Sequence, residues 1–412
     1  MGLLASLLLP AIKAAETRIW TSRKGSTIEA ELLRFDETNA TLLAAGSKQV
    51  VLPLVDLSIA DRQFMVENVG ADAKILIAGE VGEPEKQAKI DSSTFKKLKE
   101  SNLTFGTESE SDYDLLQTEH FLIASAGDIR PQGIAETAER MWHGMAFQHM
   151  NFRRDWADKR MLIFVVEDRE TYAALGKWFV AYLKEKGKGE EAGKISATWE
   201  KSGGSTLTLP DEMAEKHNVF PNARVFNVVP EQSHLFKKAM GSFLVFCMAD
   251  TLLDRQLGNI SSYGVEGLFA VSTGHSYYKE ISLTGKSETN LLSAEGSNND
   301  LLKEKKGFGD AGDWGRAVRA AVKKGTLKCE LAPMFTVKRD MVKPEELALM
   351  YSFSAYMEST PARLACFAAM VRRIESSKQI PVPEEIAKIF GFESTAALEA
   401  DWKLFVTEGK FK

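Results

Sequence analysis

The hydrophobic pattern of this chain changes its period along the sequence, and each change limits what the segment concerned can form. Residues 18–66 carry four short runs with strand-like alternation, separated by turns. From residue 119 buried-strand patterns such as Met161–Val166 alternate with helical ones, and from Phe236 onward helical spacing dominates. The 412 residues exceed what one hydrophobic core usually serves. The pattern predicts an α+β protein with a small SH3-like β-barrel, then a mixed-sheet subdomain, then a mainly helical subdomain.

We expect five segments along the chain. Residues 1–15 resemble a signal peptide, because an apolar run ends in small residues, although no Lys or Arg precedes it. Residues 16–68 are the predicted barrel, with a closing helix from Ser58 to Val66 that Ser58 caps. Residues 69–112 are a charged, Gly-containing connecting segment. Residues 113–235 and 236–412 are the α/β and helical subdomains, and the expected location is periplasmic or secreted.

The individual elements follow from the same patterns. Expected strands cover residues 120–124, 161–166, 194–199 and 205–209, and residues 187–193 are expected to form a loop. Expected helices cover residues 93–100 (at most a short helix within the connecting segment), 134–150, 169–186, 236–257, 263–272, 313–324, 345–358, 361–377, 383–390 and 394–408. In the second of these, Ile134, Ala138, Met141, Met145 and His149 share one face.

Charge and cysteine usage exclude several classes of function. The net charge of −5 leaves no basic excess to neutralise phosphates, so nucleic acid is not an expected partner. No apolar run reaches the roughly 18 residues that a membrane-spanning helix needs. The three cysteines, Cys247, Cys329 and Cys366, have no metal-ligand spacing and predict no disulfide framework.

The N-terminal segment resembles a known protein-binding module. The residues concerned are Trp20-Thr21, Gly25, Ala30, Leu43, Gly46-x-Lys48 and the run Leu52-Pro-Leu-x-x-Leu-Ser-x-x-Asp-x-x-Phe64. They resemble the SLA-homology domain of endocytic adaptors, which also occurs at the N-termini of exported proteins. The resemblance covers about 50 residues and implies an SH3-like barrel that binds a peptide or a protein.

The body from about residue 119 to 408 resembles the peptidase MA-like (gluzincin) superfamily. Thr118–Ile123 resembles the family's first strand, and Phe164–Tyr172 resembles its strand-to-helix step ending in Asp-Arg-x-x-Tyr. Met350–Tyr356 resembles the helix behind the active site, and Phe392–Trp402 resembles the closing helix. The resemblance implies a zinc-peptidase scaffold.

The same resemblance locates the positions of a metal site. Active members carry two histidines four residues apart on one helix, a catalytic Glu between them, and a downstream Glu as third ligand. Tyr263-Gly-Val-Glu-Gly-Leu-Phe269 resembles the downstream segment, with Glu266 in the ligand position. Asp250–Arg255 resembles the end of the metal helix. In this register Phe246 replaces the first His, Cys247 replaces the catalytic Glu, and Asp250 replaces the second His.

No other histidine pair restores the motif, because none of the six histidines is four residues from another. They are His120, His143, His149, His217, His234 and His275. The resemblance therefore implies no catalytic residue, no metal and no cofactor, and a vestigial site at Phe246, Cys247, Asp250 and Glu266. Gly307–Gly312 matches G-x-G-x-x-G without the preceding apolar strand that a dinucleotide site needs, so no dinucleotide is expected.

The expected function is that of an exported pseudo-metallopeptidase that binds or scaffolds a protein or peptide. One alternative is a metal-dependent hydrolase that uses Asp250, Glu266 and a further ligand; another is a purely structural envelope protein. The register predicts that Phe246 and Asp250 lie one turn apart on one helix, facing the helix that carries Glu266. Phe246 is expected to fill the place of the metal, and Arg255 and Tyr263 are candidate donors to the two carboxylates.

Overall fold

The computed structural model describes residues 17–22, 26–36, 38–71, 75, 88–98, 103, 113–148, 156, 159–199, 203–228, 240–287, 289, 313–408 and 411. The predicted signal peptide, His149, His234 and the Gly307–Gly312 motif lie outside these residues.

An N-terminal unit consists of four antiparallel strands in the order β1-β2-β3-β4, followed by one helix. Its own hydrophobic core includes Trp20, Leu32, Leu42 and Met65. No ladder joins β4 to β1 within the described part of the unit, where a single bridge links Ser22 to Leu57. The four-stranded sheet is thus confirmed, and its closure into an SH3-like barrel stays a prediction. The elements are β1 (Arg18–Thr21), β2 (Thr27–Phe35), β3 (Asn39–Ala44), β4 (Lys48–Pro53) and α1 (Ile59–Val69).

A buried carboxylate attaches α1 to β1. Asp61 accepts hydrogen bonds from the backbone N–H of Thr21 at 2.7 Å and from Ser58 Oγ at 2.8 Å, and it pairs with Arg18 Nη2 at 2.7 Å. Ser58 in turn accepts from the Asp61 N–H, which confirms the predicted N-cap. The guanidinium of Arg18 lies 3.9 Å from the centre of the Phe64 ring.

The second unit is built on a six-stranded mixed sheet in the order β5-β6-β7-β8-β10-β9. Strands β7, β8 and β10 are parallel, whereas β5, β6 and β9 pair antiparallel with their neighbours. All residues of β7 and β8 are buried, as expected of central strands covered on both faces. The strands are β5 (Lys96–Leu98), β6 (Asp114–Gln117), β7 (Phe121–Ala126), β8 (Met161–Val166), β9 (Gly204–Thr208) and β10 (Asn222–Asn227).

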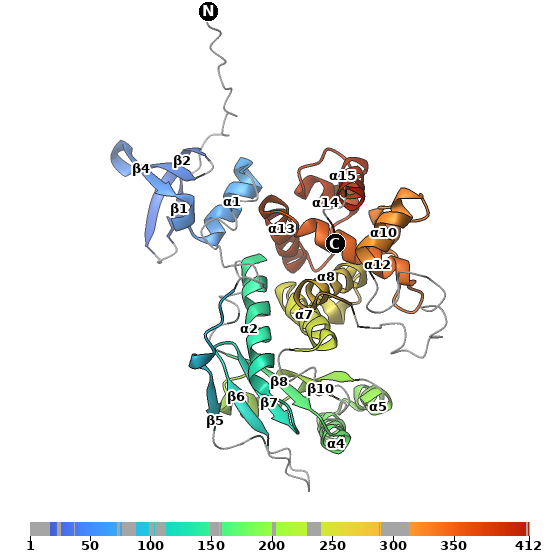
Figure 1. Ribbon diagram of the computed structural model, residues 1–412. Coiled ribbons are helices and arrows are strands. Elements are labelled where there is room, and N and C mark those ends of the chain that lie inside the picture. The colour runs from blue at the N-terminus through green and yellow to red at the C-terminus, as the bar shows by residue number, and fades with distance from the viewer. Residues whose placement is uncertain are drawn as a thin grey trace, which may run out of the picture.

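Helices cover both faces of this sheet (Figure 1). On one face Ile163 and Phe226 pack with Met141 of α2 and Leu252 of α7. On the other face Phe164 packs into a second core together with residues of α4 and α5. The helices of this unit are α2 (Pro131–Gln148), α4 (Arg169–Glu185), α5 (Gly189–Thr198) and α6 (Asp211–Lys216).

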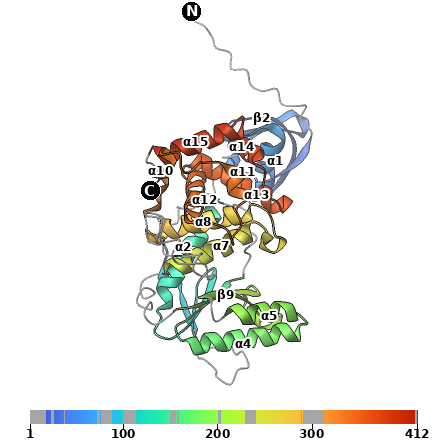
Figure 2. The ribbon, with the colours of Figure 1, turned by 90° about the vertical axis from the view of Figure 1, so that its right-hand side faces the viewer.

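The remaining helices stack on the α2–α7 side of the sheet, and α1 of the N-terminal unit lies beside α13 (Figures 1 and 2). Helix α12 is their centre, because every residue that it contributes between Leu347 and Met357 is buried. No helix in the described part of the chain is both long and apolar enough to span a membrane. These helices are α7 (Ser242–Gln256), α8 (Leu268–Thr284), α10 (Trp314–Lys323), α11 (Leu331–Phe335), α12 (Pro344–Met357), α13 (Pro361–Ser377), α14 (Pro383–Ile389) and α15 (Thr395–Thr407).

Three expected elements were wrong. Residues 194–199 are not a strand, because helix α5 starts at Gly189, inside the expected loop, and runs to Thr198. Glu190 and Glu191 lie in the first turn of α5, where the helix dipole favours acidic residues. The helix expected over residues 93–100 is a 3₁₀ turn followed by β5. The helix expected over residues 263–272 starts at Leu268 and continues to Thr284, because Gly264 and Gly267 adopt left-handed φ values of 62° and 79°.

Candidate functional site

Helix α7 carries three of the four predicted site positions. Phe246 and Asp250 lie one turn apart on it, as predicted, and Cys247 lies between them. The Phe246 side chain is buried, and its ring meets the Tyr277 ring of α8 edge to face at 4.8 Å between centroids. An aromatic ring at position 246 therefore fills part of the contact between α7 and α8.

Asp250 faces a cavity of about 390 Å³ between α7 and the β10–β9 edge of the sheet. Burial raises the pKa of its carboxyl above the ordinary value, and nearby Asp254 adds to this, although Arg224, Arg339 and His275 oppose the shift. The other residues that line the cavity are Met161, Thr206, Phe220, Pro221, Asn222, Arg224, Thr251, Asp254, Arg255, Asn259 and Ser261.

Neighbouring residues hold three of the charged groups that line this cavity. Arg224 Nη1 donates to Thr206 Oγ1 at 2.7 Å, across the β10–β9 pair. Asp254 accepts from the N–H of Ser261 at 2.8 Å and from its Oγ at 2.9 Å, which fixes the loop after α7. Arg255 lies 3.5 Å from the centre of the Phe220 ring. The cavity is thus lined by positively and negatively charged side chains whose positions are fixed by these contacts.

Cys247 does not have the character of an activated nucleophile. Burial raises the pKa of its thiol to about 11, and the attraction of Arg224 only partly offsets that effect. The thiolate, which is the reactive form, is therefore a small fraction near neutral pH.

Glu266 lies apart from the expected helix. It is exposed in the turn before α8, two residues short of the first helical residue, Leu268. Its expected place on a helix facing α7 was therefore wrong, and the left-handed Gly267 is the physical reason. Tyr263, one of the two donors expected for the carboxylates, is 66% exposed in the same loop. In the described residues no group of three or more His, Cys, Asp or Glu side chains is arranged to hold a metal ion.

The edge strand β9 forms the other side of the cavity, and its register shows which backbone groups face outward. The N–H of Asn227 donates to the Gly203 carbonyl, and the N–H of Leu209 donates to that of Pro221. Residues of odd number in β9 therefore bond to β10, and the N–H and C=O groups of Gly204, Thr206 and Thr208 point away from the sheet. Strand β9 is last in the strand order, so this edge has no described strand beside it.

An exposed aromatic residue lies beside the start of β9. Phe243, in the first turn of α7, is 38% exposed, and its ring is 6.3 Å from that of Phe226. A Cβ added to Gly204 would lie 3.4 Å from Phe243 Cε1, so the ring and the strand are in close contact. Strand β9 therefore has an apolar neighbour at one end and the charged cavity near its middle.

A buried charge cluster joins α8 to the end of α12, and the sequence did not reveal it. His275 Nδ1 lies 3.1 Å from Glu358 Oε1, and Lys279 Nζ donates to Glu358 Oε2 at 2.9 Å. Burial alone would raise the pKa of Glu358, but the Lys279 ammonium and the His275 ring outweigh it and hold that pKa below its usual value.

No protein-family model matches the chain, and neither a curated protein nor a solved structure matches it.

Proposed function

We propose that the protein is an exported, non-catalytic relative of the gluzincin metallopeptidases, and that it binds an extended segment of a peptide or protein along β9. One observation carries the proposal: β9 is an edge strand whose outward backbone groups lie next to a charged cavity that contains Asp250. An extended peptide can pair with such an edge, gaining affinity from main-chain hydrogen bonds and specificity from pockets for alternate side chains.

The side chains at the predicted site positions support a binding role over hydrolysis. A phenyl ring at Phe246 has no atom that binds a metal, and the thiol of Cys247 has a raised pKa, so it is a poor substitute for a general base. Of the four predicted site positions, Asp250 is the one that lines the cavity, and it carries a carboxyl group. The predicted site positions therefore place a carboxyl group in the cavity without a set of side chains suited to metal-dependent hydrolysis.

The surroundings of β9 indicate which side chains the groove would select. The cavity beside Thr206 offers Arg224 and Asp250, so it suits a polar or charged side chain. The exposed Phe243 ring near Gly204 suits an apolar side chain. The N-terminal unit, with its resemblance to SLA-homology domains, would supply a second protein-binding surface in the periplasm or outside the cell.

The pairing of β9 is tested by a backbone change with a matched side-chain control. Peptides selected from a random phage-displayed library against the full chain are measured by fluorescence polarisation. Thr206→Pro removes an outward-pointing N–H, and edge strands tolerate proline at such positions. This variant should bind the peptides about tenfold more weakly or worse, a loss of about 1.4 kcal/mol of binding free energy. Thr206→Val keeps the N–H and should bind within about threefold of the wild type. Equal affinities of the two variants would rule out strand pairing.

The absence of hydrolysis needs its own measurement. Elemental analysis of the purified chain should find well below about one zinc per chain, and unfolded casein should stay intact. Stoichiometric zinc that is lost, together with cleavage, on Asp250→Ala or Glu266→Ala would establish the metal-dependent hydrolase instead.

A further inference from the structure

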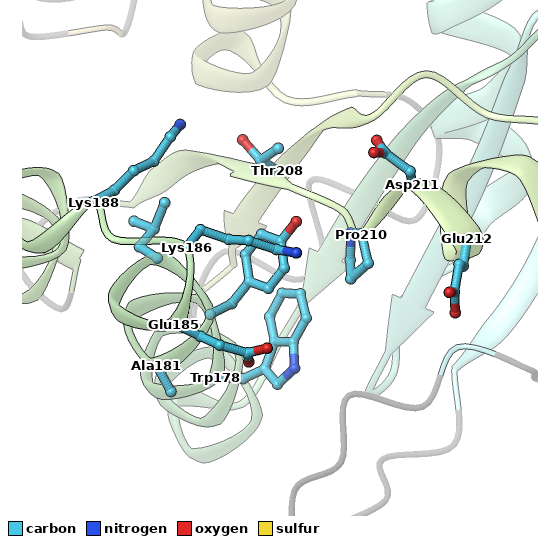
Figure 3. Close-up of a pocket in the computed structure, with 11 residues that line it drawn as sticks. Trp178, Ala181, Glu185, Lys186, Lys188, Thr208, Pro210, Asp211 and Glu212 are labelled. Atoms are coloured by element: carbon cyan, nitrogen blue, oxygen red, sulfur yellow. The ribbon is translucent and has the colours of Figure 1, made fainter.

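A second and larger cavity, of about 820 Å³, lies between the C-terminal half of α4 and the end of β9 (Figure 3). Trp178, Tyr182 and Lys186 of α4 and its following turn form one side, and Asp211 and Glu212 at the start of α6 form the other. Its volume is within the range of small-molecule sites, about 300–1,000 Å³.

The α4 side of this cavity is aromatic. Trp178 and Tyr182 are four residues apart and therefore share one face of the helix. Their rings are parallel within 7°, with centroids 5.5 Å apart, and both side chains are half-buried at the edge of the α4 core. Packing on that core fixes the rings, and part of each stays accessible from the cavity. The α4 side therefore offers two parallel aromatic rings whose positions are fixed by packing.

The rim carries charges of both signs. Lys186 Nζ lies 5.5 Å from the centre of the Tyr182 ring, and Lys188 pairs with Glu191 at 3.3 Å. Asp211 and Glu212 carry exposed carboxylates on the opposite side, and Glu185 adds another carboxylate on the α4 side (Figure 3). An anionic ligand would meet these carboxylates, and a cationic ligand would meet the lysines. A neutral ligand with many hydroxyl groups can donate to the carboxylates and accept from the ammonium groups.

We propose that this cavity binds a neutral saccharide. The apolar C–H face of a sugar ring would lie on Trp178, with its hydroxyl groups hydrogen-bonded to Lys186 on one side and to Asp211 and Glu212 on the other. The site is separate from the proposed peptide groove, because the two lie against opposite faces of the sheet and meet only at the edge strand β9. Its failure would leave the peptide-binding proposal intact.

The test is isothermal titration of the full chain with three neutral oligosaccharides: cellotetraose, maltotetraose and the tetramer of N-acetylglucosamine. At least one is expected to bind with a dissociation constant of about 1 mM or lower, and Trp178→Ala should weaken that binding about tenfold or more. Tyr263→Ala removes an exposed aromatic residue elsewhere and should leave the affinity unchanged. Asp211→Asn leaves both aromatic rings in place and should weaken saccharide binding severalfold. This variant provides the test if Trp178→Ala does not fold.

Two results would overturn the proposal. One is that none of the three oligosaccharides binds below about 10 mM, or that the Trp178 and Asp211 variants bind as the wild type does. The other is that tetramethylammonium or inorganic phosphate binds in this cavity while the saccharides do not bind. Binding of the ion in the cavity would be recognised because Trp178→Ala abolishes it, and it would show that the cavity selects a charged ligand.

Discussion

Replacing Glu358 by Gln tests the buried charge cluster with almost no change in volume. The Glu358 side chain is 5% exposed, and its partners His275 and Lys279 are 0% and 3% exposed, so water cannot replace a lost interaction. Each hydrogen bond to a charged group is worth about 1.5–3 kcal/mol, and the amide oxygen of Gln retains one acceptor. We therefore expect Glu358→Gln to lower the free energy of unfolding by about 3 kcal/mol, the low end for breaking a buried pair.

The pH dependence gives this prediction a second readout. Because the pKa of Glu358 is lower in the folded protein than its ordinary value of 4.5, the unfolded chain binds a proton first as the pH falls. The contribution of Glu358 is complete above pH 4.5 and is lost as the pH falls through the folded pKa. The stability difference between wild type and Glu358→Gln should therefore be largest near neutral pH and should shrink below about pH 4.5.

The assay is thermal unfolding followed by circular dichroism between pH 3 and pH 7. For a body of this size 1 kcal/mol shifts the melting temperature by about 2 °C, so a fall of about 6 °C is expected at pH 7. Glu190→Gln is the control, since Glu190 is 86% exposed and pairs with Lys194 on the surface; loss of that pair and of the helix-dipole interaction should change stability by less than about 1 kcal/mol. A Glu358→Gln shift as small as the control, or one that is independent of pH, would refute the reasoning.

Three further outcomes follow from the structure. Gly274→Ala should lower the free energy of unfolding, measured in urea, by about 1–3 kcal/mol, because the new Cβ would lie 2.8 Å from the carbonyl carbon of Met350. Its control, Gly193→Ala, lies in open space on α5 and should leave the stability unchanged or raise it. A fragment of residues 17–75 should unfold cooperatively by itself, since it has a separate core, and a non-cooperative melt would contradict this. Iodoacetamide at pH 8 should alkylate Cys247 far more slowly in the native than in the urea-unfolded chain, because burial raises its pKa to about 11; equal rates in peptide mass analysis would contradict this.

The elements that the sequence predicted well are those whose pattern is long and local. Strand β8 is a continuous apolar run, and the long helices α4, α13 and α15 end within two residues of their expected limits. On α2 the predicted apolar face is confirmed at Ile134, Ala138, Met141 and Met145, which are all fully buried.

The elements that were missed depend on contacts between distant parts of the chain. Strand β10 has a mixed sequence, Asn222–Asn227, and becomes a strand because β8 and β9 pair with it on both sides. Its Arg224 therefore could not be assigned to the candidate site. The buried side of α8 was missed for a similar reason: His275 is polar in the sequence, and its partner Glu358 is 83 residues away. Hydrophobic periodicity cannot indicate a buried charge whose partner is so remote.

The geometry of α7 gives its two predicted site positions, Phe246 and Asp250, different surroundings. Phe246 belongs to a row of aromatic rings that crosses the helical part, since Tyr277 lies 4.7 Å from Trp314 and Trp314 lies 6.2 Å from Tyr351. A polar ring at position 246 would interrupt that apolar row and need a partner of its own. Asp250, about 6 Å further along the helix axis, faces the cavity beside β9 instead. Packing in the helical core therefore constrains position 246, whereas position 250 is constrained by its place in the cavity beside β9.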